Sequence, residues 1–368
     1  MSYPLPKRAR EMREAARKFV EQELIPWEVH AEMHEGVLPA EVKARHQQLA
    51  RELGLNAMDI PVEHGGAGLG MLEQVAVTEE IGRVTNALGW CYSNAQKWML
   101  KACSPYQIET WIKKLITGEI HECYAITEAD AGSDVDAIKA TARRDGDDYV
   151  LNGEKWHVTS GNLADVMIFQ AKLSEGPNAG RHCLFFVDMD TPGITVLRNP
   201  AYSHTYAAHH PIYELKEVRV PAANRIGEEG AGMGFTYDWF RYERLMIAAR
   251  CCGAAARLID EATAFAQKRI VFGEPLAQQQ LIQAMLADSV TELWAARLMT
   301  FRTAEEIDAG TNVKVTHAQS SMAKLYASEM ANRVADRAVQ IFGGRGYMRE
   351  NGRASLGKEC RSRWSPYH

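Results

Sequence analysis

The feature that most constrains this fold is the order in which two kinds of sequence pattern follow one another. Residues 1–120, and the chain from about residue 232 onward, place apolar side chains at the three- and four-residue steps of amphipathic helices. Residues 121–227 instead hold short runs of β-branched and aromatic residues, separated by Gly, Asn and Pro turn signals. Because no helix of useful length separates these runs, the pattern predicts an antiparallel β unit rather than a parallel Rossmann sheet.

The same change of pattern predicts three domains. They are an N-terminal helical domain at 1–120, a middle β-domain at 121–227 and a C-terminal helical domain at 228–368. The sequence contains no tandem repeat, low-complexity tract or obvious linker between them. We therefore expect the three parts to pack as one unit.

Composition narrows the class of protein. The 368 residues include 42 Lys and Arg against 47 Asp and Glu, and the resulting net charge of -5 argues against a nucleic-acid binder. Seven cysteines, none in a CxxC pair, are typical of reduced thiols, so we expect a cytoplasmic protein. Neither a signal peptide nor an apolar run long enough to span a membrane is evident, so we expect no membrane association.

Two glycine clusters each allow two interpretations. HGGAGLG at residues 64–70 imitates part of a dinucleotide fingerprint, but no strand precedes it, which favours a plain loop between helices. FGGRGY at residues 342–347 ends a long helical pattern. Taken alone, the second cluster indicates a helix C-cap, with close approach to a phosphate as the alternative.

Two strand segments carry hydroxyl and aromatic groups. CYAITEADAGSD, residues 123–134, runs from a strand into a Ser- and Gly-containing turn that could face a polar ring edge or a thioester. NGEKWHVTSG, residues 152–161, places Trp156 and His157 near Thr159, which suits a planar cofactor. A strand end and a core aromatic are the alternative interpretations.

Glu243 lies in the helical segment RYERLMIAAR, between Arg241 and Arg244. It is either a general base aimed inward or part of a solvated, ion-paired face. No HExxH, CxxC, GxSxG or Walker A motif is present, and we expect no metal site.

Taken together, five segments resemble the acyl-CoA dehydrogenase family over nearly the whole chain, to about Asn351. They are CYAITEADAGSD, NGEKWHVTSG, ERLMIAA, KRIVFGEPLAQQQ and AVQIFGGRGY, in the family's order and at similar spacing. The resemblance implies a mainly α fold: an N-terminal helical domain, a middle antiparallel β-barrel-like domain and a C-terminal four-helix bundle. It also implies FAD between the domains and a homotetramer or homodimer.

The resemblance implies roles for particular residues. The expected cofactor-binding positions are Tyr124, Ile126, Thr127, Ser133, His157, Thr159, Arg269, Phe272, Gln280, Gln340, Gly343 and Gly344. Ser133 and Arg244 are also expected to contact the acyl-CoA substrate. His157 stands where many relatives carry an aromatic residue that stacks on the flavin, whereas Arg269, Phe272 and Gln280 match a pattern that contacts FAD across a subunit interface.

The reaction implied is α,β-dehydrogenation of an acyl-CoA thioester in fatty acid or amino acid catabolism. A carboxylate removes the α-proton while the β-hydrogen passes as hydride to flavin N5, and an electron-transfer flavoprotein takes the electrons. Glu243 matches the ERL position that supplies this base in isovaleryl- and long-chain-type members. Straight, branched and aromatic acyl chains all fit the sequence.

The tail from about residue 352 departs from the family pattern. It reads GRASLGKECRSRWSPYH, without the Glu-Gly-Thr motif that carries the base in most members. Loss of two bases from a gene encoding Asn-Pro-Val-Glu-Arg-Leu-Trp would produce a sequence that matches Asn351–Gly357, so we interpret the tail as a frameshift remnant. Two alternatives follow: a catalytically impaired member that binds flavin or CoA as a scaffold, or an acyl-CoA oxidase.

Overall fold

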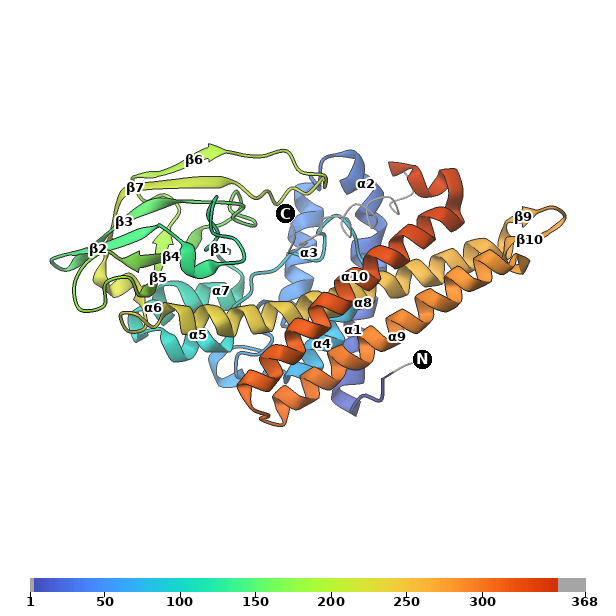
Figure 1. Cartoon of the computed structure of the whole chain (residues 1–368), viewed down its shortest axis with the longest axis horizontal. Coiled ribbons are helices and arrows are strands. Elements are labelled where there is room, and N and C mark those ends of the chain that lie inside the picture. The colour runs from blue at the N-terminus through green and yellow to red at the C-terminus, as the bar shows by residue number, and fades with distance from the viewer. Residues whose placement is uncertain (1–2, 350–368) are drawn as a thin grey trace.

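The computed structural model describes residues 3–349, which form two helical parts with a sheet between them in chain order (Figure 1). The helices of the first part are α1 (Lys7–Phe19), α2 (Glu28–Met33), α3 (Ala40–Glu52), α4 (Met71–Ile81), α5 (Lys97–Ala102), α6 (Pro105–Gln107) and α7 (Lys113–Thr117). A π-helical turn, Val20–Leu24, extends α1. Asp308 accepts hydrogen bonds from the free amides of Met71 and Leu72, and thereby ties the start of α4 to the C-terminal part.

Eight strands form the central sheet. They are β1 (Glu122–Ala125), β2 (Thr141–Asp145), β3 (Asp148–Lys155), β4 (Val166–Leu173), β5 (His182–Asp188), β6 (Ile194–Arg198), β7 (Ile212–Pro221) and β8 (Arg225–Ile226). Their order is β6-β7-β3-β2-β4-β5-β8, with β1 beside β4. Most neighbours are antiparallel, as predicted, but β1 and β2 both run parallel to β4, which the local pattern does not reveal.

Both faces of the sheet are covered where β4 runs. Met167 and Phe169 point into a core between strands, whereas Val166 and Ile168 point into a second core shared with the helices α5–α7. Trp111, in the helical turn between α6 and α7, stacks on Phe186 of β5 with 4.7 Å between ring centroids. The alternation of side chains along each strand therefore decides which residues face the helical parts.

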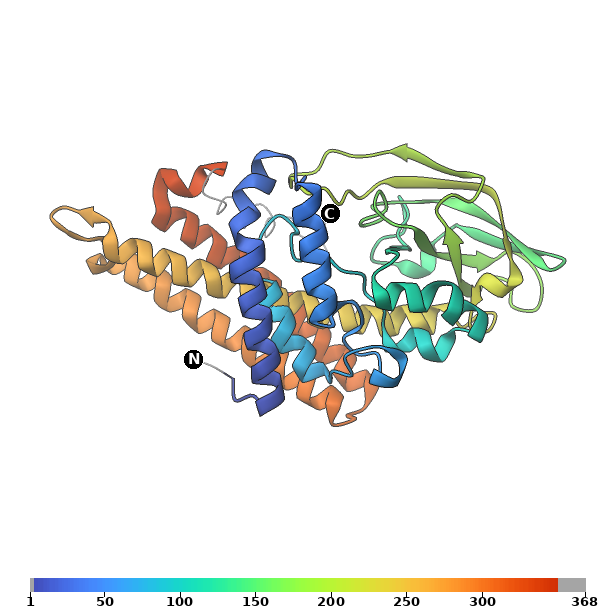
Figure 2. The same cartoon turned by 180° about the vertical axis from the view of Figure 1, so that it is seen from behind.

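Three long helices dominate the described part of the C-terminal domain: α8 (Gly232–Lys268), α9 (Gln280–Asp308) and α10 (Val313–Phe342). They lie side by side, with the sheet near one end of α8 (Figures 1 and 2). A two-stranded hairpin, β9 (Ile270–Val271) and β10 (Glu274–Pro275), joins α8 to α9. This hairpin projects from the end of the molecule farthest from the sheet (Figure 1).

α4 and α8 pack unusually close together because glycines face the contact on both helices. A Cβ added to Gly253 would lie 1.8 Å from the carbonyl oxygen of Glu79, and one added to Gly82 would lie 2.4 Å from the Cα of Arg250. Any side chain at either position would force the helices apart. The contact fixes the part of α8 that carries Arg250.

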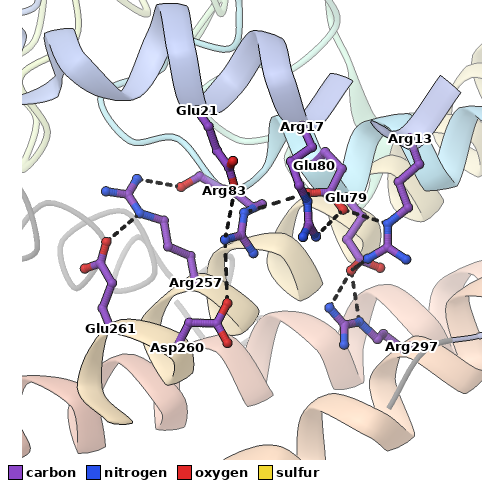
Figure 3. A network of polar contacts seen from close by, with 10 residues as sticks. All are labelled: Arg13, Arg17, Glu21, Glu79, Glu80, Arg83, Arg257, Asp260, Glu261 and Arg297. Atoms are coloured by element: carbon purple, nitrogen blue, oxygen red, sulfur yellow. Dashed lines mark hydrogen bonds and ion pairs between the residues drawn. The ribbon is translucent and has the colours of Figure 1, made fainter. Parts of the chain in front are cut away.

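A network of ion pairs joins α1, α4, α8 and α9 (Figure 3). The Glu80 carboxylate is fully buried and accepts from Arg13 Nε at 2.6 Å and from Arg17 Nη2 at 2.9 Å. Glu79 is bound by Arg297 of α9, at 2.6 and 2.9 Å. On α8, Arg257 pairs with Glu261 and with the buried Glu28. The helical parts are thus cross-linked by multiply hydrogen-bonded charges.

The predicted fold class, a mainly α protein with a central β-domain, is confirmed. The predicted domain boundaries fall in the connections before β1 and before α8, and they remain a division proposed from the sequence. Within residues 3–349, no helix is long and apolar enough to cross a membrane. The tail from about residue 352, and with it the frameshift hypothesis, lies outside the described residues.

Candidate functional site

Glu243 lies on α8, two residues before Leu245 and three before Met246, both of which pack in the hydrophobic core. Its side chain is 20% exposed. Asn94 Nδ2 donates to Glu243 Oε1 at 3.4 Å, and Arg250 Nη1 lies 3.8 Å from Oε2. Burial raises the pKa of Glu243, and the positive charge of Arg250 opposes the shift only in part. The carboxyl group therefore has the enhanced basicity that a general base requires.

A second carboxyl group, that of Glu122, stands at the start of β1 beside this site. Both of its oxygens accept from the main-chain N–H of Asn94, at 3.2 and 3.4 Å. Burial raises the pKa of Glu122 to about 7, and the charge of Glu243 adds to that shift. Asn94 thus touches both carboxyl groups, one through its main chain and the other through its side chain.

The expected flavin-contacting residues of the middle domain follow Glu122 along β1 and the turn after it. The Tyr124 ring stacks on Trp239 of α8 with 4.5 Å between centroids, so β1 and α8 face one another here. Ile126 is buried and Thr127 half-buried. Ser133 lies exposed in the turn beyond. The structure therefore places Tyr124 against α8 one helical turn from Glu243, with Ile126 and Thr127 following on the same strand and turn.

Thr159 and His157 lie in the segment after β3 and contact a histidine-rich loop at 201–211. Thr159 Oγ1 is 3.1 Å from His210 Nδ1, and His157 Nδ1 is 2.7 Å from the Tyr202 hydroxyl. His157 holds a left-handed backbone conformation, with φ 55°, which is uncommon outside glycine. Burial and neighbouring histidines lower the pKa of His210 to about 4, so His210 is neutral beside Thr159 at neutral pH.

The remaining expected cofactor residues gather at the opposite end of the molecule. Arg269, Phe272 and Gln280 lie at or next to the β9–β10 hairpin, whereas Gln340, Gly343 and Gly344 lie where α10 ends (Figure 1). A ring contact between Phe265 and Phe342, with centroids 4.8 Å apart, joins the two helix ends. A single chain therefore presents the expected cofactor residues as two separate groups.

Arg244 lies one residue from the candidate base and faces α10. Its Nη1 is 2.8 Å from His317 Nε2 and 3.1 Å from Ser321 Oγ. Ser133, the other residue expected to contact substrate, lies on the turn after β1. The two expected substrate contacts thus come from different domains.

The exposed groups suit a flavin dinucleotide in their chemistry. The Thr159 side chain is exposed and carries a hydroxyl group, which lies 3.1 Å from His210 Nδ1. The Phe272 side chain, 99% exposed, presents an aromatic face. A Cβ added to Gly343 or Gly344 would meet no atom within 4 Å, so the main chain there is open to a phosphate group. Within residues 3–349, no cluster of three or more potential metal ligands occurs.

Sequence reasoning missed Asn94 and Glu122 at the site, as well as the loop histidines beside Thr159. Glu122 immediately precedes the CYAITEADAGSD segment, where a carboxylate at a strand start carries no distinctive signal. Asn94 is 149 residues from Glu243, and only tertiary structure brings them together. The adjacent histidines His209 and His210 lie in a stretch without strand or helix pattern, and nothing in the sequence indicates the contact of His210 with Thr159.

Three family models match the chain. They are described as the N-terminal, middle and C-terminal domains of acyl-CoA dehydrogenase, and they match residues 6–119, 123–215 and 230–363. Together the three models cover most of the sequence in the predicted order.

Individual relatives agree with the family models. Mitochondrial short-chain specific acyl-CoA dehydrogenase of Mus musculus is 35% identical over 354 residues, which are 95% of this chain and 84% of that protein. The CarC subunit of the caffeyl-CoA reductase-Etf complex of Acetobacterium woodii is 32% identical over 355 residues, 95% of this chain and 92% of CarC. The structure of butyryl-CoA dehydrogenase from Megasphaera elsdenii superimposes with a TM-score of 0.88 and 26% identity, covering 98% of this chain and 94% of that one.

Proposed function

The chain belongs to the acyl-CoA dehydrogenase family, and we propose that it oxidises an acyl-CoA thioester to the 2-enoyl-CoA with Glu243 as the base. The enzyme is an FAD-dependent oxidoreductase acting on CH–CH donors. The observation that carries the role of Glu243 is its partly buried carboxyl group, with a raised pKa, on the helix that faces β1. This position matches the ERL base of some family members.

Glu243 acts by removing the α-proton of the thioester. The C–H bond breaks and an O–H bond forms on the carboxyl group, so the base becomes neutral as negative charge develops on the thioester. Burial favours the neutral carboxyl product, and Asn94 and Arg250 orient its oxygens. A base that gains proton affinity from burial takes the proton more readily than an exposed glutamate would.

FAD, when bound, supplies the acceptor for the β-hydrogen, which leaves as a hydride. Thr127 and Thr159 would hold the ring edge through their hydroxyl groups, with Tyr124, Ile126 and His157 beside it. Arg269, Phe272, Gln280, Gln340, Gly343 and Gly344 would hold the rest of the cofactor. Ser133 and Arg244 would contact the acyl-CoA, with Ser133 also able to reach the cofactor.

The separation of the two groups of cofactor residues supports an assembly in which one subunit completes the site of another. Apolar side chains lie exposed along α9 and α10, including Leu281, Trp294, Leu298, Met322 and Leu325. Surfaces of this kind mark protein–protein contacts. We therefore include a homotetramer or homodimer in the proposal, to be measured by analytical ultracentrifugation of the FAD-loaded protein.

The electron acceptor in the proposal is an electron-transfer flavoprotein. It is supported by the similarity to CarC, which is named as a subunit of a complex with such a protein. The proposal also places the enzyme in the cytoplasm, where the six cysteines in the described part of the chain, all unpaired, stay reduced.

An anaerobic titration with straight, branched and aromatic acyl-CoAs tests the function. We expect one class to bleach the flavin absorbance of the wild-type protein in proportion to the enoyl-CoA formed. Glu243→Gln should bind the same acyl-CoA without bleaching. Full bleaching by Glu243→Gln would contradict the assignment of the base, and a flavin-loaded wild type that no acyl-CoA bleaches would contradict the function.

A further inference from the structure

Glu122 is a carboxyl group placed to act on Glu243. Side chains alternate along a strand, so Glu122 points to the same face of β1 as Tyr124, whose ring stacks on Trp239 of α8. Glu243 lies one helical turn beyond Trp239 on α8. The two carboxyl groups therefore approach the same point from the sheet and from the helix.

Asn94 connects the two carboxyl groups physically. Its main-chain N–H donates to both oxygens of Glu122, at 3.2 and 3.4 Å, while its side-chain Nδ2 donates to Glu243 at 3.4 Å. Asn94 lies between α4 and α5, outside any helix or strand. Glu122 thus fixes the main chain whose side chain holds one oxygen of Glu243.

Among residues 3–349, Arg250 supplies the one positive charge within 4 Å of Glu243. Arg250 Nη1 stands 3.8 Å from Glu243, and the buried Arg250 Nε has no hydrogen-bond partner. Among the described residues, the other titratable groups that interact with one of the two carboxyl groups are Tyr92 from the segment before Asn94, Tyr242 from α8 and Cys123 from β1. Cys91 and Asp59 interact in turn with Tyr92 and Tyr242. Arg250 is the one cation among these groups. The carboxyl groups therefore repel one another when both are ionised, and their protonation is coupled.

We propose that Glu122 is a positioning residue for the base: it holds Asn94, and its ionisation raises the proton affinity of Glu243. The proposal rests on the proposed function, because it requires Glu243 to remove the α-proton. When Glu122 is neutral, Glu243 is the single anion of the pair. When Glu122 is ionised, proton transfer to Glu243 relieves the repulsion between the two carboxylates.

The pH range of this effect follows from the burial of Glu122. Because its pKa is raised to about 7, Glu122 is mainly neutral at pH 6 and mainly ionised at pH 8. The contribution of Glu122 to the basicity of Glu243 should therefore be absent at pH 6 and present at pH 8. A purely structural role would contribute equally at both values.

Kinetics of Glu122→Gln across this range test the proposal. Glutamine keeps an oxygen that accepts from Asn94 and removes the charge. We expect kcat/KM to match wild type at pH 6 and to fall about fivefold below it at pH 8, mainly in kcat. Glu119→Gln, an exposed carboxylate three residues away, is the matched control and should follow wild type at both values.

Glu122→Ala separates the two parts of the role. It removes the hydrogen bonds to Asn94 as well as the charge, so we expect an additional loss that does not change with pH. An equal fractional loss in Glu122→Gln at pH 6 and pH 8, or no loss at all, would overturn the proposal.

Infrared difference spectra between pH 6 and pH 8 give a readout that does not depend on turnover. We expect wild type and Glu119→Gln to lose a protonated-carboxyl C=O band as pH rises, and Glu122→Gln to lack it. In Glu243→Gln the midpoint of this band should move to lower pH, because the neighbouring charge is gone. A band that keeps its midpoint in Glu243→Gln would refute the coupling.

The two sets of measurements separate the proposals. If Glu243→Gln retains full turnover, the proposed base is wrong. If Glu243→Gln is inactive and Glu122→Gln shows a loss that does not vary with pH, the base stands and the role of Glu122 is wrong.

Discussion

Two clusters of buried charge, one around Glu80 and one around Glu243, show how pairing decides what burial does to a carboxyl group. Burial pushes the pKa of Glu80 upward, but Arg17 and Arg13 outweigh it, so the pKa lies below its usual range. Burial also raises the pKa of Glu243, and there the single guanidinium of Arg250 does not restore it. The Glu80 network is therefore committed to the ionised state, whereas the site keeps a carboxyl group able to gain a proton.

Distance explains the difference. The guanidinium nitrogens of Arg13 and Arg17 approach Glu80 to 2.6 and 2.9 Å, whereas Arg250 stands 3.8 Å from Glu243. The shorter contacts are charge-assisted hydrogen bonds, and the longer contact is an ion pair without one. The close ion pairs of Glu80 therefore stabilise the fold, whereas the longer ion pair of Glu243 leaves its carboxylate able to take a proton.

Glu243→Gln should have the largest effect and should act on catalysis alone. Loss of the base is expected to lower kcat about 10³-fold, equivalent to about 4 kcal/mol, with the free energy of unfolding at or above the wild-type value. Rapid-reaction kinetics and urea denaturation of the same preparation measure both quantities. If Glu243→Gln lost stability as well as activity, Glu243 would not differ from the Glu80 network in its role.

Glu80→Leu should show the opposite pattern. It leaves Arg13 and Arg17 without their carboxylate partner, at a cost of about 3 kcal/mol in the free energy of unfolding, while kcat per folded protein stays near wild type. Because the pKa of Glu80 is lowered, its stabilising effect is complete above its ordinary value and is lost as pH falls through the native pKa. Urea denaturation should therefore show wild type and variant converging in acid.

Glu122→Gln should produce a smaller change in stability that runs the other way with pH. A raised native pKa means that wild type loses stability as pH rises from 4.5 to about 7, because the folded state holds the proton more tightly than the unfolded state. The variant should therefore gain about 2 kcal/mol on wild type between pH 5 and pH 8. An unchanged difference across this range would show that Glu122 is not perturbed.

Glu14→Gln should have the smallest effect on the free energy of unfolding. Glu14 pairs with Lys18 on the solvent-facing side of α1, where both side chains are more than half exposed. The expected change in the free energy of unfolding is below about 0.5 kcal/mol and should vanish at high salt. A loss comparable with that of Glu80→Leu would mean that burial is not what separates the pairs.

Local sequence pattern was sufficient to predict the helices and most strands, because periodicity and turn residues depend only on neighbouring positions in the chain. The match of Glu243 to a family motif likewise needed one segment only. The parallel pairing of β1 with β4 could not be predicted, because a strand's partner depends on the path of the chain between them. Asn94 and Glu122 could not be predicted for the same reason. Each acts on Glu243, which lies more than 100 positions away in the sequence.

α8 carries both Glu243 and Arg257, which are 14 positions apart and therefore about 21 Å apart along the helix axis. A rigid rod of that length acts as a lever. A tilt of about one degree at the Arg257 end would displace the Glu243 carboxyl group by about 0.4 Å, close to the tolerance of about 0.5 Å for catalytic alignment. The glycine contact with α4 and the salt bridges around Arg257 thus determine the position of the Glu243 carboxyl group without contacting it.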